Sequence, residues 1–404
     1  MEKELFEKSL GIEKPLYIEE IKLDLEKGEL HIHLNFERGG EFDCSGCSSK
    51  ELPVHDTKPK TWRHLNFFQY KCYLHLRAPR TKCKDCGTRL WLAPWDRKGS
   101  GFTMLFEAFI MTLAKEMSVS QLAELIDEHD TKIWRVVHHH VNIAYEKKDF
   151  SNVIEVGCDE TSTRKGHNYV TVFADMETKE VIYATEGKNA ATIERFKDKL
   201  PEHNGDAQKI KEITIDMSPA FIRGVTDNLP NATITFDKFH VVKALNEAQD
   251  KVRRAEQKEN PLLKKSRYLW LMNPNSLTEK QEQQLGVLQT QNLKTAEAYR
   301  MKLTFQEIYR EIKDPEIAEK AINEWLVMAE KSEIEPIVKF TEMIRKHFDG
   351  IMRYFTSKLT SGAMEGLNSR IQNIKRRARG FRNIDNFISM IYLSFAGLEL
   401  DLPT

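Results

Sequence analysis

Two Cys-x-x-Cys pairs constrain the fold of this chain more than any other feature of its sequence. Cys44 and Cys47 form the first pair, Cys83 and Cys86 form the second, and 35 residues separate the pairs. Four thiolates at this kind of spacing can close a tetrahedral structural zinc site, which leaves no open position for catalysis. Paired redox thiols are the alternative interpretation. We expect one zinc ion held by all four cysteines.

The segment between the cysteine pairs is longer than the roughly 15–20 residues usual in such sites. Residues 60–65 and 70–77 alternate apolar and polar side chains, which predicts the two strands of a β-hairpin. The pattern therefore favours a zinc ribbon with an enlarged β-layer. Cys72 and Cys158 have no such partners, and we expect both to be buried apolar residues.

Charge changes sharply near the N-terminus, although 61 Lys and Arg balance 61 Asp and Glu over the whole chain. Residues 1–43 carry 12 acidic side chains against 6 basic ones, whereas residues 50–98 carry 12 basic against 4 acidic. We interpret the switch as a boundary between an acidic first segment, which matches no known pattern, and a basic module. Because the net charge is zero, any affinity for nucleic acid must be local.

The sequence contains no sign of a membrane segment. No apolar run reaches the roughly 18 residues that a spanning helix needs, and the first residues lack the apolar stretch of a signal peptide. The apolar stretch at residues 387–398 is too short to span a bilayer and is expected in the core. We therefore expect a cytoplasmic protein.

Residues 102–141 predict three helices. An apolar-periodic helix covers residues 102–115, a capping box at Ser118 opens a short helix through Ile126, and Asp130 caps a third helix through Val141. Two short helices joined by a tight turn indicate a helix-turn-helix, whose last helix would enter a DNA major groove. That last helix carries Lys132, Trp134 and Arg135, and the candidates for DNA contact are Lys132 and Arg135. The alternative is an ordinary three-helix packing unit.

From residue 152 onward the pattern changes to short strands and helices. The expected strands are residues 153–158, 169–174, 180–185, a run that ends at Asp216, and 233–236, with helices over residues 190–200 and 219–228. This order fits a mixed sheet with helices on its faces. Residues 240–350 are almost wholly helical, and we interpret them as an insertion into the α/β domain.

Three acidic residues lie at the ends of separate expected elements. Asp159 and Asp216 each close an apolar, β-branched run, and Glu365 opens an amphipathic helix. Mg²⁺ is bound by one or two carboxylates together with substrate phosphates, so these residues suggest metal-dependent phosphodiester chemistry on nucleic acid. Glu160 adjoins Asp159, but strand alternation turns its side chain to the opposite face. Only one of the two can be a ligand, and we choose Asp159.

The helix that Glu365 opens is expected to run over residues 362–379, with Gly380 as its C-terminal stop. A dense basic cluster lies about three turns after Glu365, which favours phosphate contacts near the metal site. A solvated helix face is the alternative interpretation. The cluster consists of Lys375, Arg376, Arg377, Arg379 and Arg382.

Several of these segments occur together, and in the same order, in one known family. They are His55-Asp…Trp62-Arg-His-Leu, Cys83-x-x-Cys86-Gly, Gly157-Cys-Asp159-Glu, Asp216-Met-Ser-Pro-Ala, Phe236-Asp-Lys-Phe-His-Val-Val-Lys243 and Glu365-Gly-Leu-Asn…Ile374-Lys-Arg-Arg-Ala-Arg-Gly-Phe-Arg. On these motifs, which span about residues 44–395, the chain resembles transposases of the ISL-three family of bacterial insertion sequences.

The resemblance implies a multidomain α+β protein: a zinc ribbon, a helix-turn-helix, and an RNase H-like α/β catalytic core that an all-helical insertion interrupts. The expected division is an acidic segment (1–43), a zinc ribbon (44–100), a helix-turn-helix (101–150), the first part of the core (151–240), the insertion (241–350) and the C-terminal helices (351–404).

The resemblance also implies an activity and its residues. Asp159, Asp216 and Glu365 would form a DDE triad that binds two Mg²⁺ or Mn²⁺ ions, and Asp237 and His240 would support the site in an auxiliary role. One structural Zn²⁺ would complete the cofactors. The partners would be double-stranded DNA, as terminal inverted repeats and as target, and further copies of the chain in a dimer or larger synaptic assembly. No membrane and no small-molecule substrate would be involved, and the protein would act at the bacterial nucleoid.

Two other classes of function remain open at this point. One is a DNA-binding regulator whose catalytic domain is silent, and the intact triad argues against it. The other is a different RNase H-like nuclease, such as a junction resolvase. The zinc ribbon, the helix-turn-helix and the long helical insertion argue against that class.

Overall fold

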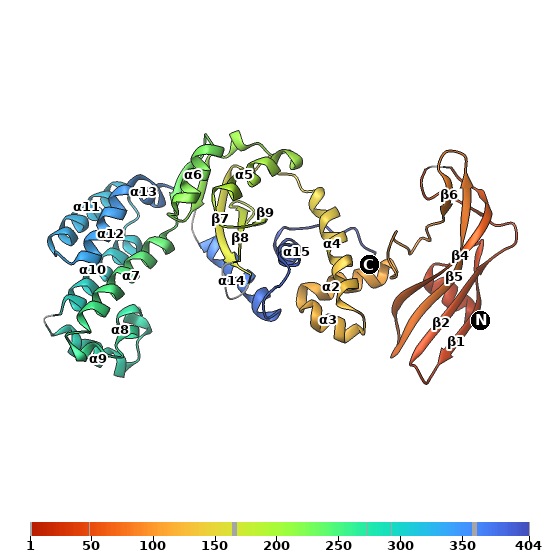
Figure 1. Ribbon diagram of the computed structural model, residues 1–404, viewed down its shortest axis with the longest axis horizontal. Coiled ribbons are helices and arrows are strands. Elements are labelled where there is room, and N and C mark those ends of the chain that lie inside the picture. The colour runs from red at the N-terminus through yellow and green to blue at the C-terminus, as the bar shows by residue number, and fades with distance from the viewer. Residues whose placement is uncertain are drawn as a thin grey trace. The chain divides into compact units, whose positions relative to one another are not determined.

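The computed structural model describes residues 2–47, 49–163, 168–272, 274–291, 293–357 and 362–403. The chain forms two compact units (Figure 1). Unit 1 comprises Met1–Ala144 with Leu398–Thr404, and unit 2 comprises Tyr145–Gly397. Among the described residues, no helix is both long and apolar enough to cross a membrane.

Unit 1 contains a twisted six-stranded sheet in the part of the chain that is described. Its elements are α1 (Glu2–Leu10), β1 (Leu16–Asp24), β2 (Glu29–Phe36), β3 (Glu41–Phe42), β4 (Leu52–Phe67), β5 (Tyr70–Cys83) and β6 (Gly87–Leu90). The order is β1-β2-β5-β4-β3, and β6 pairs with β5. The long strands β4 and β5 are antiparallel, which confirms the expected hairpin between the cysteine pairs.

The acidic first segment belongs to this sheet, which its composition did not reveal. Strand β2 pairs in parallel with β5, so the first strands extend the layer that the zinc-ribbon hairpin forms. Alternate residues of β2, such as Ile32, pack with Trp62 and Leu74 in one core on a single face. Histidine and asparagine side chains alternate with these apolar ones along β2, so a charge count of the segment does not reveal the strand.

Three helices complete unit 1, and they confirm the expected elements closely: α2 (Met104–Glu116), α3 (Val119–Ile126) and α4 (Asp130–Glu146). Both halves of the Ser118 capping box are formed with Gln121. Helix α4 does not end at Val141 as expected. Ala144 and Tyr145 continue the buried stripe at the helical spacing, so the helix extends to Glu146.

Unit 2 is built on a five-stranded sheet among its described residues, in the order β11-β10-β7-β8-β9. The strands are β7 (Glu155–Ser162), β8 (Tyr169–Asp175), β9 (Val181–Glu186), β10 (Glu212–Ile215) and β11 (Thr233–Phe236). Strands β7, β8 and β9 form an antiparallel meander, and β10 and β11 run parallel to β7. This is the mixed sheet that the sequence predicted.

Helices cover both faces of the sheet (Figure 1). They are α5 (Ala190–Lys199) and α6 (Pro219–Asn228) with the short 3-10 turns η1 (Leu200–His203) and η2 (Ala207–Lys209), and α14 (Gly362–Arg377) and α15 (Ile384–Phe395). On one face Phe173 of β8 stacks on Phe196 of α5, with ring centroids 4.4 Å apart. On the other face the Tyr392 hydroxyl of α15 accepts a hydrogen bond from the Ala184 N–H of β9 at 2.9 Å.

The expected helical insertion lies between β11 and α14. It comprises α7 (Lys238–Glu256), η3 (Pro261–Leu263), α8 (Arg267–Leu271), η4 (Pro274–Ser276), α9 (Glu279–Gln289), α10 (Lys294–Glu311), α11 (Pro315–Lys331), α12 (Glu335–Lys346) and α13 (Phe348–Thr356). Trp270 and Tyr299 are central to a core that α8, α9 and α10 share. Gly350 of α13 packs so closely on β11 that a Cβ atom there would lie 2.5 Å from the Phe236 ring.

Candidate active site and metal centres

Helix α14 lies along β7 in a fixed register. Asn368 Nδ2 donates a hydrogen bond to Asp159 Oδ2, and Gln372 Nε2 donates one to Thr161 Oγ1 at 2.7 Å. Four residues of a helix advance about 6.0 Å and two residues of a strand advance about 6.6 Å, so one row of the helix follows one face of the strand. These contacts fix the position of α14, and with it Glu365, along the strand that carries Asp159.

The same row continues at both ends. A Cβ atom on Gly157 would lie 2.6 Å from Met364 Sδ, so glycine is required for the helix to approach this closely. At the far end Lys375 Nζ donates to Ser162 O at 2.9 Å and to Ser162 Oγ at 3.2 Å. Burial lowers the pKa of Lys375. Lys375, a predicted DNA contact, therefore already holds α14 onto the strand.

Asp159 does not close its strand, which corrects the sequence expectation. It is the fifth residue of β7, because Thr161 and Ser162 still pair with β8. Burial raises the pKa of Asp159, while the nearby His240 and the hydrogen bond from Asn368 oppose the rise. His240 Nε2 lies 3.9 Å from Asp159 Oδ1. A half-buried carboxylate whose pKa is raised in this way is a candidate functional group.

Glu160 is close to Asp216 although it lies on the other face of β7. Burial raises the pKa of Glu160 first, followed by the negative charges of Asp216 and Asp159. Glu160 Oε2 is buried and has no hydrogen-bond partner among the described residues. Asp216 follows β10 directly, and its Oδ1 accepts the Ser218 N–H at 2.9 Å. Three acidic groups therefore meet where β7 and β10 lie side by side.

Asp237 and His240 stand at the start of α7. Asp237 is the N-cap residue, and its Oδ1 accepts the Phe239 N–H at 2.8 Å. The cap fixes the first turn of α7, which carries His240 toward Asp159. Lys238 lies between them, with Nζ 5.4 Å and 5.5 Å from the ring centroids of Tyr309 and Tyr354.

Glu365 is exposed in the first turn of α14. Burial lowers the pKa of Lys238, and the Glu365 carboxylate opposes that fall, so the two charges interact. Asp159, Asp216 and Glu365 do not all lie within 4.8 Å of one another. In the described residues, the only potential metal-ligand group that tight is the cysteine cluster. The three carboxylates therefore lie in one region of the core, but they are not close enough together to bind a single metal ion in this conformation.

The four predicted zinc ligands converge in unit 1. The sulfur atoms of Cys44, Cys47, Cys83 and Cys86 lie within 4.8 Å of one another, with 3.5 Å between Cys47 and Cys83. A tetrahedron of thiolates at about 2.3 Å from a zinc ion has edges of about 3.8 Å, so the donor set fits zinc. The Cys86 and Asp85 backbone N–H groups lower the pKa of Cys83 to about 6, which favours the thiolate that binds metal.

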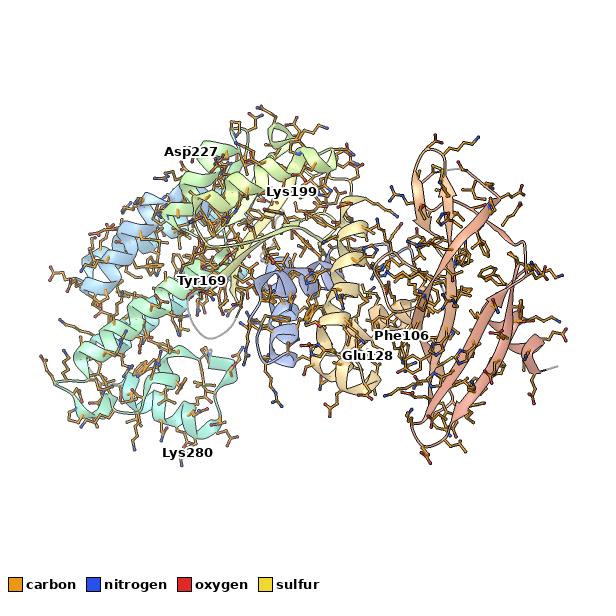
Figure 2. All side chains as sticks on the ribbon, turned by 45° about the vertical axis from the view of Figure 1, so that its right-hand side comes forward. Phe106, Glu128, Tyr169, Lys199, Asp227 and Lys280 are labelled. Atoms are coloured by element: carbon orange, nitrogen blue, oxygen red, sulfur yellow. The ribbon has the colours of Figure 1, made fainter. Side chains whose placement is uncertain are left out.

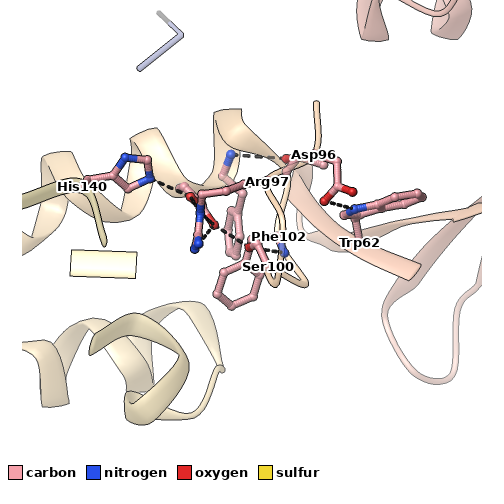
Figure 3. A network of polar contacts seen from close by, with 9 residues as sticks. Trp62, Asp96, Arg97, Ser100, Phe102 and His140 are labelled. Carbon is pink, nitrogen blue, oxygen red and sulfur yellow. Dashed lines mark hydrogen bonds and ion pairs between the residues drawn. The ribbon is translucent and has the colours of Figure 1, made fainter. Parts of the chain in front are cut away.

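A buried ion network joins the helix-turn-helix to the loop before it (Figure 3). Glu107 of α2 is fully buried; it accepts two hydrogen bonds of 2.8 Å from Arg97 and interacts with His140 Nε2 of α4 at 2.6 Å. Burial alone would raise the pKa of Glu107, but the hydrogen bonds from His140, Arg97 and Ser100 outweigh it and lower the pKa to about 2. Composition gave no hint of this network, because its members are scattered along the sequence.

Of the remaining predicted DNA contacts, Arg377 is half-buried and the other five are exposed. Lys132 and Arg135 are exposed on α4, and Arg376, Arg379 and Arg382 are exposed at and after the end of α14. Gly380 has φ +89 and its N–H bonds to the Lys375 carbonyl at 2.8 Å, which confirms the expected helix stop. Sequence reasoning gave Asn368 no role. The four-residue spacing between Asn368 and Gln372 places both on one face of the helix, and this was the signal that could have indicated a contact with β7.

Comparison with known proteins assigns all three modules. A family model described as a transposase, with a DDE domain of type ISL3, matches residues 156–391. The chain belongs to the ISL3 family of transposases. A helix-turn-helix domain of transposase family ISL3 matches residues 93–141 of this transposase, and a zinc finger of IS204/IS1001/IS1096/IS1165 transposases matches residues 41–86.

Two named relatives are similar over most of their length. The ISL3 transposase is 28% identical to the transposase for insertion sequence element IS1001 of Bordetella parapertussis over 363 residues, 88% of this chain and 89% of the relative. It is 26% identical to the transposase for insertion sequence element IS1557 of Mycobacterium tuberculosis over 437 residues, 99% of this chain and 97% of the relative. The chain is thus a transposase, an enzyme that acts on DNA, with a helix-turn-helix and a zinc ribbon.

Proposed function

We propose that this transposase binds the terminal inverted repeats of an insertion sequence and catalyses DNA cleavage and strand transfer at Asp159, Asp216 and Glu365. The observation that carries the proposal is the register of α14 on β7. It brings the helix of Glu365 over the strand of Asp159, with the parallel strand that leads to Asp216 alongside. The acidic groups come from three separate elements of one core.

The carboxylates suit hard divalent cations. Asp159 and Asp216 would hold one or two Mg²⁺ or Mn²⁺ ions, and Glu365 would complete the set from α14. The accumulation of negative charge supports this fit, since burial raises the pKa of Asp159 and the nearby Asp237 carboxylate raises it further. When bound, the ions would stabilise the attacking and leaving oxygens of an in-line displacement at phosphorus.

The chain's own residues would prepare that site. Asn368 donates to one oxygen of Asp159 and so orients the other toward His240 and the substrate side. Asp237 caps α7 and keeps His240 in place, which makes both positioning residues in this proposal. Lys238 is held between two tyrosine rings of the insertion and would meet a DNA phosphate beside Glu365.

The zinc ribbon and helix-turn-helix would recognise the ends of the element, and the basic residues after Ile374 would contact DNA phosphates near the cleaved bond. Two ends must be joined in one reaction, so the active form would be a dimer or a larger synaptic assembly. Its substrate is chromosomal DNA, which places its action at the nucleoid of the bacterial cytoplasm.

A cleavage and strand-transfer assay tests the proposal. Purified protein is incubated with a labelled duplex that carries the inverted repeat flanking the gene and with a target plasmid, with and without Mg²⁺. We expect metal-dependent nicking at the repeat end, followed by covalent joining to the target. Binding without cleavage would support the silent regulator instead. Cleavage without joining, on any branched or hybrid substrate, would support another nuclease.

A further inference from the structure

A cavity of about 290 Å³ in unit 1 has no role in the chemistry described above. It lies where β4 and β5, the loop over residues 97–102, and the start of α4 meet, and Figure 2 labels Glu128 and Phe106 in this region. Four of its lining residues are cations: Arg63, Arg97, Lys132 and Arg135. Glu128 is the one acidic residue in the lining.

Arg63 is a buried cation that lacks a full set of partners. Its side chain is 3% exposed, and its guanidinium carbon lies 5.4 Å and 4.9 Å from the ring centroids of Tyr73 and Phe106. Its two terminal nitrogens donate to backbone carbonyls and to Asn66. The Nε N–H makes no hydrogen bond within the described chain, because Glu128 Oε1 lies 3.9 Å away. The Tyr73 and Phe106 rings pack on the guanidinium group of Arg63 and hold its plane. The unpaired Nε N–H therefore points in one direction.

The charges around the cavity leave an excess of positive charge. Arg97 is neutralised by Glu107, and Lys132 Nζ pairs with Glu128 Oε2 at 2.7 Å. Arg135 makes no ion pair within the described residues and is exposed at the mouth of the cavity. Glu128 alone therefore faces Arg63, Lys132 and Arg135.

An anion of single charge with several acceptor oxygens would satisfy this site. A phosphodiester has that chemistry, and guanidinium groups hold it through charge-assisted hydrogen bonds. Phosphate contacts of this kind fix a protein's register on duplex DNA without reading its sequence. The cavity adjoins α4, the last helix of the helix-turn-helix, which is the element expected at the DNA surface.

We propose that this cavity binds one backbone phosphate of duplex DNA between Arg63 and Arg135, an inference that rests on the proposed DNA binding of unit 1. Arg135 and Lys132 are then anchors for the DNA backbone, and base recognition falls to other residues of α4. A water molecule that bridges Arg63 Nε and Glu128 is the alternative occupant, since the 3.9 Å gap is of the size that a bridging water spans.

Salt dependence distinguishes the two occupants. The full-length protein binds a random-sequence duplex in fluorescence anisotropy between about 50 and about 200 mM salt. Arg135→Ala should weaken binding and reduce the slope of log affinity against log salt by about 0.9, because one phosphate contact is lost. Arg38→Ala removes the same charge from an exposed turn of unit 1 that does not line the cavity, and its slope should equal that of the wild type.

A second variant gives an effect of opposite sign. Glu128→Gln removes the one acidic charge in the lining and should tighten DNA binding several-fold, whereas a water-bridged ion pair predicts lower thermal stability and no gain. An unchanged slope for Arg135→Ala together with no gain for Glu128→Gln overturns the proposal. If the wild type and Arg38→Ala bind no duplex at all, the proposed DNA binding itself is wrong.

Discussion

Asp159 shows how one side chain depends on a helix that follows it by some two hundred residues. Its carboxylate accepts a hydrogen bond from Asn368. Burial raises its pKa, so the fold disfavours the negatively charged form. The adjacent Glu160 faces the other side of β7 and is also half-buried, and its buried Oε2 atom has no hydrogen-bond partner within the described residues. Substitutions of Asp159 and of Glu160 can therefore distinguish an effect on cleavage from an effect on stability.

Asp159→Asn, Asp216→Asn and Glu365→Gln should each reduce metal-dependent cleavage to background while terminal-repeat binding persists. The amide keeps the shape of the side chain but removes the charge that binds metal. Glu160→Gln should retain far more cleavage than Asp159→Asn and should raise the thermal midpoint, since it removes a buried, unpaired charge. A gel cleavage assay and a melting curve measure both. An active Asp159→Asn with a dead Glu160→Gln would show that the ligand has been assigned to the wrong neighbour.

Lys302 in the insertion should make stability depend on pH. It is fully buried, its Nζ donates to the Trp270 carbonyl at 2.6 Å, and burial lowers its pKa from 10.5 to about 8. The charged form is therefore penalised in the fold. The penalty is absent above about pH 10.5 and complete below about pH 8, where it corresponds to about 3 kcal/mol. Loss of the hydrogen bond offsets about 1 kcal/mol, so Lys302→Met should stabilise the insertion by about 2 kcal/mol at pH 7.

Denaturant unfolding at pH 7 and at pH 10 measures this difference. The gain of Lys302→Met over wild type should shrink at the higher pH, because the wild-type lysine is then largely neutral. Lys294→Met, at an exposed position on the same helix, is the control and should show no such pH dependence. A constant difference between Lys302→Met and wild type across this range would contradict the assigned environment.

The side-chain pattern identified Asp159 and Asp216 as candidate catalytic residues but did not predict their surroundings. Strand alternation places Asp159 and Glu160 on opposite faces of β7, because alternation is a local property of the backbone. It could not reveal that Glu160 remains buried beside Asp216, since that proximity depends on the pairing of β7 with β10. Arg63 was hidden for the same reason. Phe106 and Glu128, which pack beside it, come from parts of the chain well beyond its own hairpin.

At the scale of elements, α14 combines a candidate metal ligand with a basic end. Lys375 is used to hold the helix to β7, which leaves the arginines after it as the candidates for DNA contact. Replacing Arg376, Arg377 and Arg379 with alanine should weaken binding to all sequences alike. The salt slope should fall by about 0.9 for each phosphate contact that is lost.

The control for this triple variant is a set of three exposed lysines of the insertion changed to alanine, Lys258, Lys280 and Lys320. These should leave the slope as it is. A wild-type slope in the arginine variant would mean that the basic end of α14 is only a solvated face.

The zinc ribbon is the second element whose role can be isolated. The protein should contain one zinc ion per chain, and Cys83→Ser should lose it and destabilise unit 1, since metal binding there contributes directly to folding. Elemental analysis of protein purified in reducing, chelator-free buffer measures the ion. Cys72→Ser is the control, because Cys72 is buried away from the cluster and should leave the zinc content unchanged. Zinc-free wild-type protein would exclude the assignment.

Elements with strong local signals were predicted almost residue for residue. Helix α6 and strand β11 have their expected bounds, because Pro219 starts the helix and a β-branched run follows. Strands β1 and β2 were not expected, since β1 pairs only with β2 in the described chain and the parallel partner of β2, strand β5, lies some forty residues away. Helix starts are fixed by neighbours in sequence, whereas parallel pairing is fixed by the fold.

At the scale of the whole molecule, the proposed reaction requires two DNA ends in one assembly. We expect protein mixed with terminal-repeat duplex and Ca²⁺ in place of Mg²⁺ to form a complex with at least two chains and two duplexes. Light scattering after size exclusion measures the mass, and random-sequence duplex of equal length is the control. A stable complex of one chain with one duplex that is still competent for joining would contradict the synaptic assembly.

The order of the parts along the chain has a consequence for synthesis. The residues of unit 1 up to Ala144 are translated first, whereas Glu365 comes after the whole insertion. At about 10 residues per second the ribosome needs about 20 s to pass from one to the other, and N-terminal domains fold first. In the proposed mechanism a newly made chain would therefore bind DNA before it could cleave it. Under the proposed binding of terminal repeats by unit 1, a chain released by a ribosome that stops within the insertion would occupy the ends of the element and protect them from the complete enzyme.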